Sequence, residues 1–165
     1  MSDKENYKFK VSRIISTVWP LGLFPFAQGT ISSIFAAFIG YLTNIFFGSN
    51  ITLLLAILVG IIGYFSTKIY IKKIKKKDPS EVVIDEFSGQ LIATAAAGIS
   101  PFFNILALIL FRVLDILKPG IIKKVENLDG ESGIMMDDWV AGFITAAIII
   151  IFSTLDLIQY KWLII

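Results

Sequence analysis

The sequence predicts an all-α membrane protein: a polytopic helix bundle with about three spanning helices plus one broken or re-entrant helix. Hydrophobic residues make up 56% of the 165 residues, and the mean hydropathy is +0.78. Soluble domains are typically about 45–50% apolar. Four long apolar segments and the positions of the basic residues supply the rest of this prediction.

The chain begins with a polar segment, residues 1–13, for which we expect a cytoplasmic location. No short apolar stretch with a small-residue cleavage site follows it, so we expect no removable signal peptide. Residues 14–28 are apolar but contain Pro20, Gly22 and Pro25. This composition predicts irregular or re-entrant backbone beside a protein cavity. Residues 1–165 have the length of a single membrane-embedded domain.

Two neighbouring apolar segments, residues 30–47 and 51–71, predict the first two spanning helices. Only Gly48, Ser49 and Asn50 separate them, and so short a connection allows only a tight hairpin. We therefore expect the two helices to be antiparallel. The last segment, residues 139–155, has about 17 residues, which is the lower limit for a span.

The third apolar segment, residues 90–111, is interrupted between Gly98 and Pro101, and proline with a nearby glycine breaks a helix. A full span here would put the four basic residues at 112–124 outside, against the positive-inside rule. Two half-helices that dip in and return would instead leave fourteen of the fifteen basic residues on the cytoplasmic side. A tilted ordinary helix that mildly breaks the rule is the alternative.

The composition excludes several kinds of site. The chain contains no cysteine and no histidine. Disulfides, zinc–thiolate sites, cysteine nucleophiles and histidine-dependent lipid phosphatase chemistry are therefore absent. The net charge of +2 is too small to suggest a nucleic-acid partner.

Two acidic pairs, Asp85-Glu86 and Asp137-Asp138, lie at the borders of apolar segments. A carboxylate beside hydrocarbon is costly unless it is paired, solvated or bound to metal. Oxygen ligands without histidine favour Mg²⁺ over zinc. We expect the second pair at a helix start, where capping accounts for one aspartate. It does not account for the other, because adjacent residues diverge by about 100° around a helix.

Arg112, Asp115 and Lys118 are spaced three residues apart, so one helix face would carry a cation, an anion and a cation. Such a face can hold a phosphate and a metal that bridges to it. An intrahelical ion pair with a snorkelling lysine is the alternative. Gly29 and Thr30 stand at the entry to the first span, where free backbone amides can bind an anion or where the helix is simply capped.

Taken together, these blocks resemble the phosphatidylglycerophosphatase A family, which are small bacterial inner-membrane lipid phosphatases. The resemblance covers about residues 21–149, in the family's order and spacing, and rests on residues 22–30, 84–87 with Gly89, 111–112 with Asp115 and Lys118-Pro119, and 133–135 with Asp137-Asp138 and Ala141-Gly142. Gln28 stands where the family has proline, Ser32 stands near an expected glycine, and Gly120 follows Pro119 where a further proline is common.

The resemblance implies Mg²⁺-dependent hydrolysis of phosphatidylglycerophosphate to phosphatidylglycerol and inorganic phosphate in phospholipid biosynthesis. The partners would be the phospholipid substrate and the bilayer of the bacterial cytoplasmic membrane, with the active site facing the cytoplasm. On this basis the predicted catalytic residues are Asp85, Glu86, Asp115, Asp137 and Asp138. Asp85, Glu86, Asp137 and Asp138 would hold one or two metal ions. The predicted substrate-binding residues are Arg112, Lys118, Gly29 and Thr30.

Several alternatives stay open at this point. The nucleophile is either a water or a carboxylate that becomes an aspartyl-phosphate. The substrate could be another lipid phosphate. A small ion or proton transporter would also contain acids and a broken helix, but transport sites belong near the midplane and these acids lie at segment borders.

Overall fold

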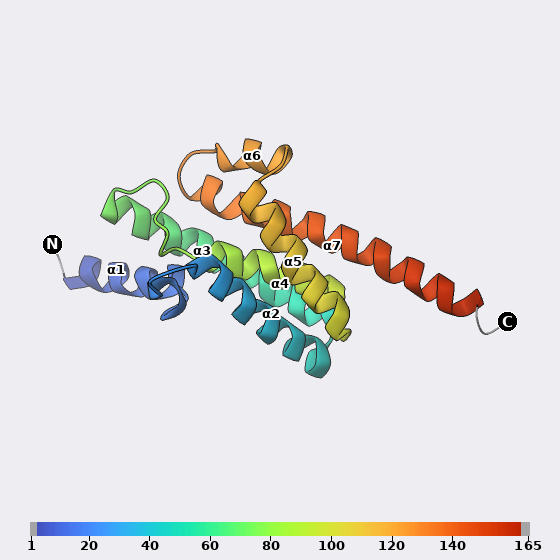
Figure 1. Ribbon diagram of the computed structural model, residues 1–165. Helices are drawn as coiled ribbons and strands as arrows, with labels where there is room; N and C mark the ends of the chain where they lie inside the picture. Colours follow the sequence, from blue (N-terminus) through green and yellow to red (C-terminus); the bar gives the residue numbers. More distant parts are fainter. Residues whose placement is uncertain (1–2, 163–165) are drawn as a thin grey trace.

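The computed structural model describes residues 3–162, with side chains described for residues 5–155. The described chain is helical, without strands, which confirms the predicted fold class (Figure 1). Its elements are α1 (Asp3–Ser16), the 3-10 helix η1 (Leu21–Leu23), α2 (Gln28–Phe47), α3 (Ser49–Ile74), α4 (Ile84–Ala97), α5 (Pro101–Leu117), α6 (Ile121–Glu126) and α7 (Glu131–Trp162). Lys4 and Lys161, which entered the topology prediction, lie outside the described side chains.

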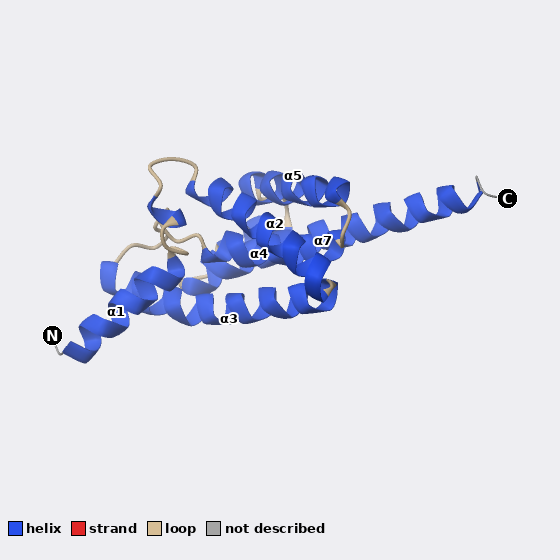
Figure 2. Ribbon diagram, turned by 90° about the horizontal axis from the view of Figure 1, so that it is seen from below, coloured by secondary structure: helices blue, strands red, loops and turns tan. Residues whose placement is uncertain are grey.

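Three helices of the described chain are long and apolar enough to cross a bilayer: α2, α3 and residues 131–155 of α7. They run along roughly one direction, and the end of α7 extends past the other helices (Figure 2). Gly48 alone separates α2 from α3 and has a positive φ of 85°. Glycine adopts this backbone without steric cost, which explains the tight hairpin predicted from the sequence.

The broken third segment forms a helical hairpin from α4 and α5. The chain reverses after Ala97 through Gly98, which has a φ of 59°, and Pro101 begins α5. The side-chain amides of Asn44 and Asn104 donate to the Gly98 carbonyl at 2.9 and 3.1 Å. These bonds satisfy a carbonyl at the C-terminal end of α4 that has no hydrogen-bond partner within the helix. The C-terminal end of α5 thereby returns to the N-terminal end of α4, as the re-entrant arrangement requires.

α4 is the central helix and packs most extensively on α7. A Cβ added at Gly89 would lie 2.6 Å from the Asp138 carbonyl oxygen, and one at Gly142 would lie 2.4 Å from the Gly89 carbonyl oxygen. The two helix backbones are therefore in direct contact. Small residues permit such an approach between membrane helices. This crossing holds the first turn of α4 against the second turn of α7.

Two expectations about helix boundaries need correction. Residues 3–16 form α1, where the sequence indicated only a polar segment. The helix that carries Asp137 and Asp138 begins at Glu131, so the pair lies inside α7 and not at its start. The reason is burial: Ile134 and Met135 pack in the interior and extend the helix toward its N-terminus, while the loop glycine is Gly130, with a φ of 65°.

Candidate active site

The predicted site residues gather around one cavity of about 520 Å³. It lies where the N-terminal ends of α2 and α4 meet the C-terminal end of α5 and the first turns of α7. Eight of the nine predicted residues line it: Gly29, Asp85, Glu86, Arg112, Asp115, Lys118, Asp137 and Asp138. Thr30, the ninth, is not among the lining residues. Segments more than a hundred residues apart thus form a single site.

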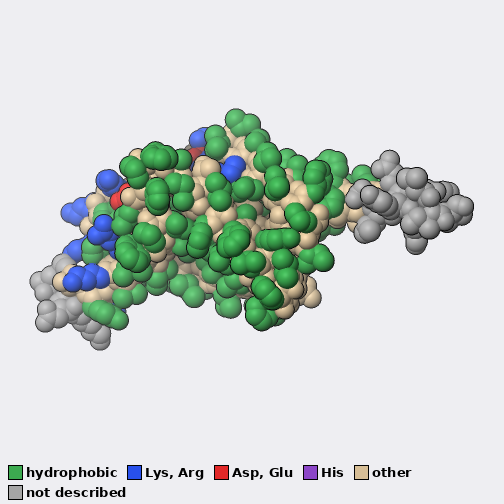
Figure 3. All heavy atoms as spheres, turned by 60° about the horizontal axis from the view of Figure 1, so that its bottom comes forward, with side chains coloured by type: hydrophobic (Ala, Val, Ile, Leu, Met, Phe, Trp, Pro, Cys, Tyr) green, Lys and Arg blue, Asp and Glu red, His purple; other side chains and the backbone are tan. Residues whose placement is uncertain are grey.

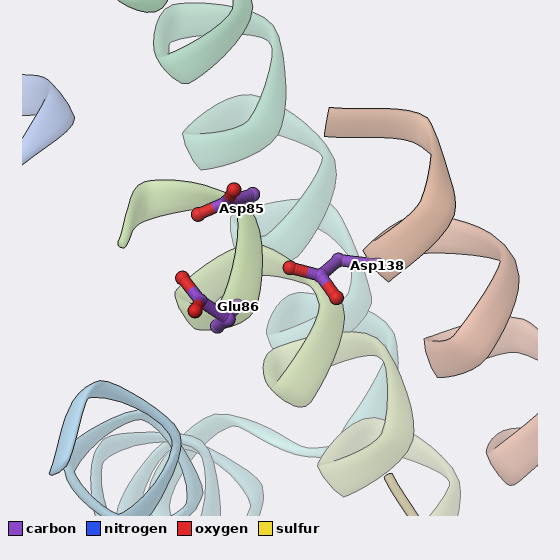
Figure 4. Close-up of side chains that lie close together, drawn as sticks. All are labelled: Asp85, Glu86 and Asp138. Carbon is purple, nitrogen blue, oxygen red and sulfur yellow. The ribbon is translucent and has the colours of Figure 1, made fainter. Parts of the chain in front are cut away.

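Asp85, Glu86 and Asp138, here called the acidic cluster, bring three carboxylates together in the cavity (Figure 4). Each offers one carboxylate oxygen, and these oxygens lie within 4.8 Å of one another. Asp85 and Glu86 come from the first turn of α4, and Asp138 approaches from α7. The contact between the backbones of Gly89 and Asp138 sets this distance.

The acidic cluster has too few partners for its charge. One buried oxygen of each carboxylate has no hydrogen-bond partner among the described residues. Burial raises the pKa of Asp85 well above its usual value, and the neighbouring charge of Glu86 raises it further. Buried unpaired oxygens of this kind are costly, and a cation relieves both the repulsion and the missing contacts. The cluster can therefore hold a metal ion, and its hard oxygen donors fit Mg²⁺.

Arg112 borders the acidic cluster from α5. Its Nη1 atom donates to the Asp115 carboxylate and, at 3.4 Å, to the Ser33 hydroxyl of α2. The Nε atom is buried without a partner among the described residues. The intrahelical ion pair considered from the sequence is present, yet the guanidinium keeps an unused donor at Nε.

Lys118 follows the last turn of α5 and has a left-handed backbone, with a φ of 45°. Its ammonium donates to Asp137 of α7 at 2.6 Å and pairs with Glu126 of α6 at 3.0 Å. Burial alone would lower the pKa of Lys118, but the hydrogen bond and the charge of Asp137, together with Glu126, raise it above its usual value. Lys118 is therefore a permanent cation that is held across helices, not a snorkelling side chain.

Gly29 stands at the start of α2, directly against this charged centre. A Cβ at this position would lie 2.2 Å from Glu86 Oε1 and 3.2 Å from Arg112 Nη1. No side chain fits there without displacing one of these groups. The residue before α2, Ala27, has a left-handed φ of 51°, and Gln28 lines the cavity too.

Some cavity residues were missed by sequence reasoning. Glu126 and Lys123 of α6 line the cavity and form an ion pair with each other. Lys77 and Ser80, from the connection between α3 and α4, line it as well. Lys77 enters the sequence analysis only as one of the basic residues that predict the topology, and no local pattern indicates that α6 folds over Lys118.

The sequence of this chain is similar to a known family and to several named relatives. The family model described as phosphatidylglycerophosphatase A matches residues 14–153. A putative phosphatidylinositol-3-phosphatase of Bacteroides thetaiotaomicron is 33% identical over 137 residues, covering 78% of this chain and 85% of the relative. The phosphatidylglycerophosphatase A of Escherichia coli is 34% identical over 130 residues, covering 78% and 75%, and that of Haemophilus influenzae is 33% identical over 141 residues, covering 84% and 83%.

No solved structure matches the chain significantly. The family match spans most of the sequence, and the three relatives named above are covered over 75% to 85% of their length. The matched region contains every residue that lines the cavity. The chain is therefore a member of the phosphatidylglycerophosphatase A family and a membrane-embedded phosphatase.

Proposed function

We propose that this protein hydrolyses phosphatidylglycerophosphate to phosphatidylglycerol and inorganic phosphate, depends on Mg²⁺, and serves phospholipid biosynthesis. The observation that carries the proposal is the buried acidic cluster with unpartnered oxygens, which lines the same cavity as Arg112 and Lys118. A phosphomonoester needs both kinds of group: cations for its oxygens and carboxylates to hold a metal. Two relatives that carry the corresponding name support this substrate.

The metal would be held by Asp85, Glu86 and Asp138, the three residues of the acidic cluster. When bound, Mg²⁺ supplies positive charge to the phosphomonoester and Lewis acidity to the reaction. The sequence also predicts Asp137 as a metal ligand, and its carboxylate accepts a hydrogen bond from Lys118. We propose that Asp137 orients the Lys118 side chain, in addition to any contact with the metal. Asp115 holds Arg112 in the same way.

Arg112 and Lys118 would bind the equatorial phosphate oxygens. Both are held by carboxylates in the free protein, so phosphate binding exchanges one set of charge-assisted hydrogen bonds for another. Their charge then opposes the negative charge that develops during phosphoryl transfer. The nucleophile is a water or one of the cavity carboxylates.

The orientation we propose has the cavity facing the cytoplasm at the bacterial cytoplasmic membrane. Most of the visible basic side chains gather at one end of the molecule and others lie near its upper edge, while hydrophobic side chains are spread over much of the remaining face (Figure 3). The basic residues at 68–77 and 118–124 lie at the cavity's end of the helices. This distribution supports the cytoplasmic assignment through the positive-inside rule.

A second substrate has a specific observation in its favour, because one relative is named as a putative phosphatidylinositol-3-phosphatase. Both lipids carry a phosphomonoester on a head group that a phosphodiester joins to the diacylglycerol. The deciding experiment measures phosphate release by the purified protein from phosphatidylglycerophosphate, phosphatidylinositol 3-phosphate, phosphatidic acid and a soluble phosphomonoester, each with Mg²⁺ or with EDTA.

We expect phosphatidylglycerophosphate to be the best substrate and EDTA to abolish its hydrolysis. Preference for phosphatidylinositol 3-phosphate would replace the substrate assignment, and activity in EDTA would refute the metal assignment. Asp129→Asn is the matched control for variants of the acidic cluster, since Asp129 is exposed and does not line the cavity.

A further inference from the structure

The outward face of α1 is apolar, although its other face already has a packing partner. Tyr7, Val11 and Ile14 follow the spacing of one helix face and are all exposed, Tyr7 at 69% and Ile14 at 55%. On the opposite face, Phe9 stacks on Tyr70 of α3 with ring centroids 5.7 Å apart. In a membrane protein, an exposed apolar stripe on a helix with basic side chains beside it is typical of a helix that contacts the lipid interface.

The apolar stripe continues past the end of α1. Trp19, which is 65% exposed, and Leu23 in η1 extend it toward α2, and both lie beside Ile14. The C-terminal end of α1 is bound to the start of α4, because the Val83 amide donates to the Ser16 carbonyl at 3.0 Å. The stripe therefore lies at the same end of the molecule as the active-site cavity, which in the proposed orientation is where the bilayer meets water.

A hollow of about 340 Å³ interrupts this surface and combines basic with apolar walls. Here called the N-terminal hollow, it is lined by Lys10, Arg13, Ile14, Thr17, Trp19 and Leu23. No acidic side chain of the described residues lines it, and it shares no lining residue with the active-site cavity. The two cations are thus available to a ligand, although Arg13 also lies near the Tyr70 hydroxyl.

Thr17 gives independent support for a ligand. The residue is fully buried, lines the N-terminal hollow, and its hydroxyl has no hydrogen-bond partner among the described residues. Buried hydroxyls in folded proteins are almost always satisfied. A phosphate oxygen is an acceptor that would satisfy this one.

We propose that the N-terminal hollow binds one anionic phospholipid of the surrounding leaflet. Its phosphodiester would lie against Lys10 and Arg13, and one acyl chain would pack along Ile14, Trp19 and Leu23. A soluble anion has no apolar part to pack on the apolar wall. The positively charged choline of a zwitterionic lipid is not attracted to the two cations. Two basic residues near a membrane surface favour an anionic lipid by roughly tenfold or more.

Trp19 makes binding measurable. The protein in detergent micelles is titrated with phosphatidylmethanol carrying brominated acyl chains, which quench nearby indole fluorescence, and in parallel with brominated phosphatidylcholine. Phosphatidylmethanol has a phosphodiester but no phosphomonoester, so it is neither substrate nor product of the proposed reaction. The Trp19 signal is the difference between the protein and Trp19→Phe.

We expect half-maximal quenching of Trp19 at a mole fraction of phosphatidylmethanol roughly tenfold below that of phosphatidylcholine. The variant Lys10→Gln/Arg13→Gln should lose this preference, while Lys72→Gln/Lys76→Gln, which removes two exposed lysines elsewhere, should keep it. Lys10→Glu, a single change at an exposed position, repeats the test if the double variant does not fold.

Equal quenching by the two lipids, or an anionic preference that survives Lys10→Glu, would overturn the proposal. Displacement of the lipid by millimolar dimethyl phosphate would also overturn it, because the hollow would then be an anion site without need of a lipid. Failure of this test leaves the phosphatase assignment untouched, since no residue is shared between the two cavities.

Discussion

Two groups of charged side chains in the active-site cavity differ in whether their buried charges are paired. In one group, the acidic cluster of Asp85, Glu86 and Asp138 has unpartnered oxygens. In the other, Lys118 joins Asp137 and Glu126, and Glu126 in turn pairs with Lys123, a set here called the lysine network. The lysine network balances its own charge, whereas the acidic cluster needs a cation from outside. The acidic cluster can therefore hold a metal, and Lys118 in the lysine network can exchange a carboxylate for another anion.

The largest effect should come from removing a member of the acidic cluster. Asp138→Asn is expected to lower kcat for lipid phosphate release by about 100-fold or more, because it removes charge where the metal and the transition state need it. The measurement is a steady-state assay in saturating Mg²⁺. Asp129→Asn should stay within twofold of the parent, and an active Asp138→Asn protein would refute the metal site.

The two groups of side chains should differ most clearly in how their variants change the Tm of the metal-free protein. In EDTA, Asp138→Asn should raise Tm by about 2–4 °C, since it relieves repulsion in a cluster without a cation. Asp137→Asn should lower Tm by a similar amount or more, because it removes a charge-assisted hydrogen bond to Lys118 worth about 1.5–3 kcal/mol. Thermal unfolding of both variants in one detergent checks this. Shifts of the same sign would remove the distinction between the two groups.

Gly29→Ala tests the contact between α2 and the acidic cluster. The added methyl group would overlap Glu86 Oε1 and crowd Arg112 Nη1. We expect a loss of roughly 10–100-fold in kcat, since small displacements of positioned groups are costly. Thr30→Ala, one residue further along and outside the cavity lining, serves as the matched control. Equal losses in both variants would indicate a general defect in α2 instead.

The smallest effect is expected from Glu126→Gln. This change removes one of the two carboxylates that hold Lys118 and leaves the closer one, Asp137. Lys118 should then exchange more readily onto phosphate, lowering KM about two- to threefold with kcat unchanged. Substrate titrations of the variant measure both parameters. A fall in kcat would show that α6 contributes to the chemistry and not only to binding.

Much of the fold was predictable because it depends on local properties of the chain. Apolar length indicated α2, α3 and α7, and Gly98 with Pro101 indicated the break between α4 and α5. The start of α7 was not predictable in the same way. Burial of Ile134 and Met135 extends that helix, and burial depends on neighbours distant in sequence.

The candidate site was likewise predictable where it depends on residue types and not where it depends on contacts between helices. Residue types and spacing singled out the five acids, Arg112 and Lys118, because carboxylates and cations beside hydrocarbon need an explanation wherever they lie. The division of labour among the acids could not be predicted. Asp137 and Asp138 are adjacent, yet a turn of about 100° points one at Lys118 and the other at Asp85 and Glu86.

The sequence by itself thus determined a helical membrane protein with several carboxylates at the borders of its apolar segments, because hydropathy and ionisable groups are properties of single residues and short segments. Only the tertiary structure decided which carboxylates lack a partner. That depends on the backbone contact between α4 and α7 at Gly89 and Gly142, and on the folding of α6 over Lys118. Electrostatic balance is set by distances of a few ångströms between helices, and no sequence spacing fixes those.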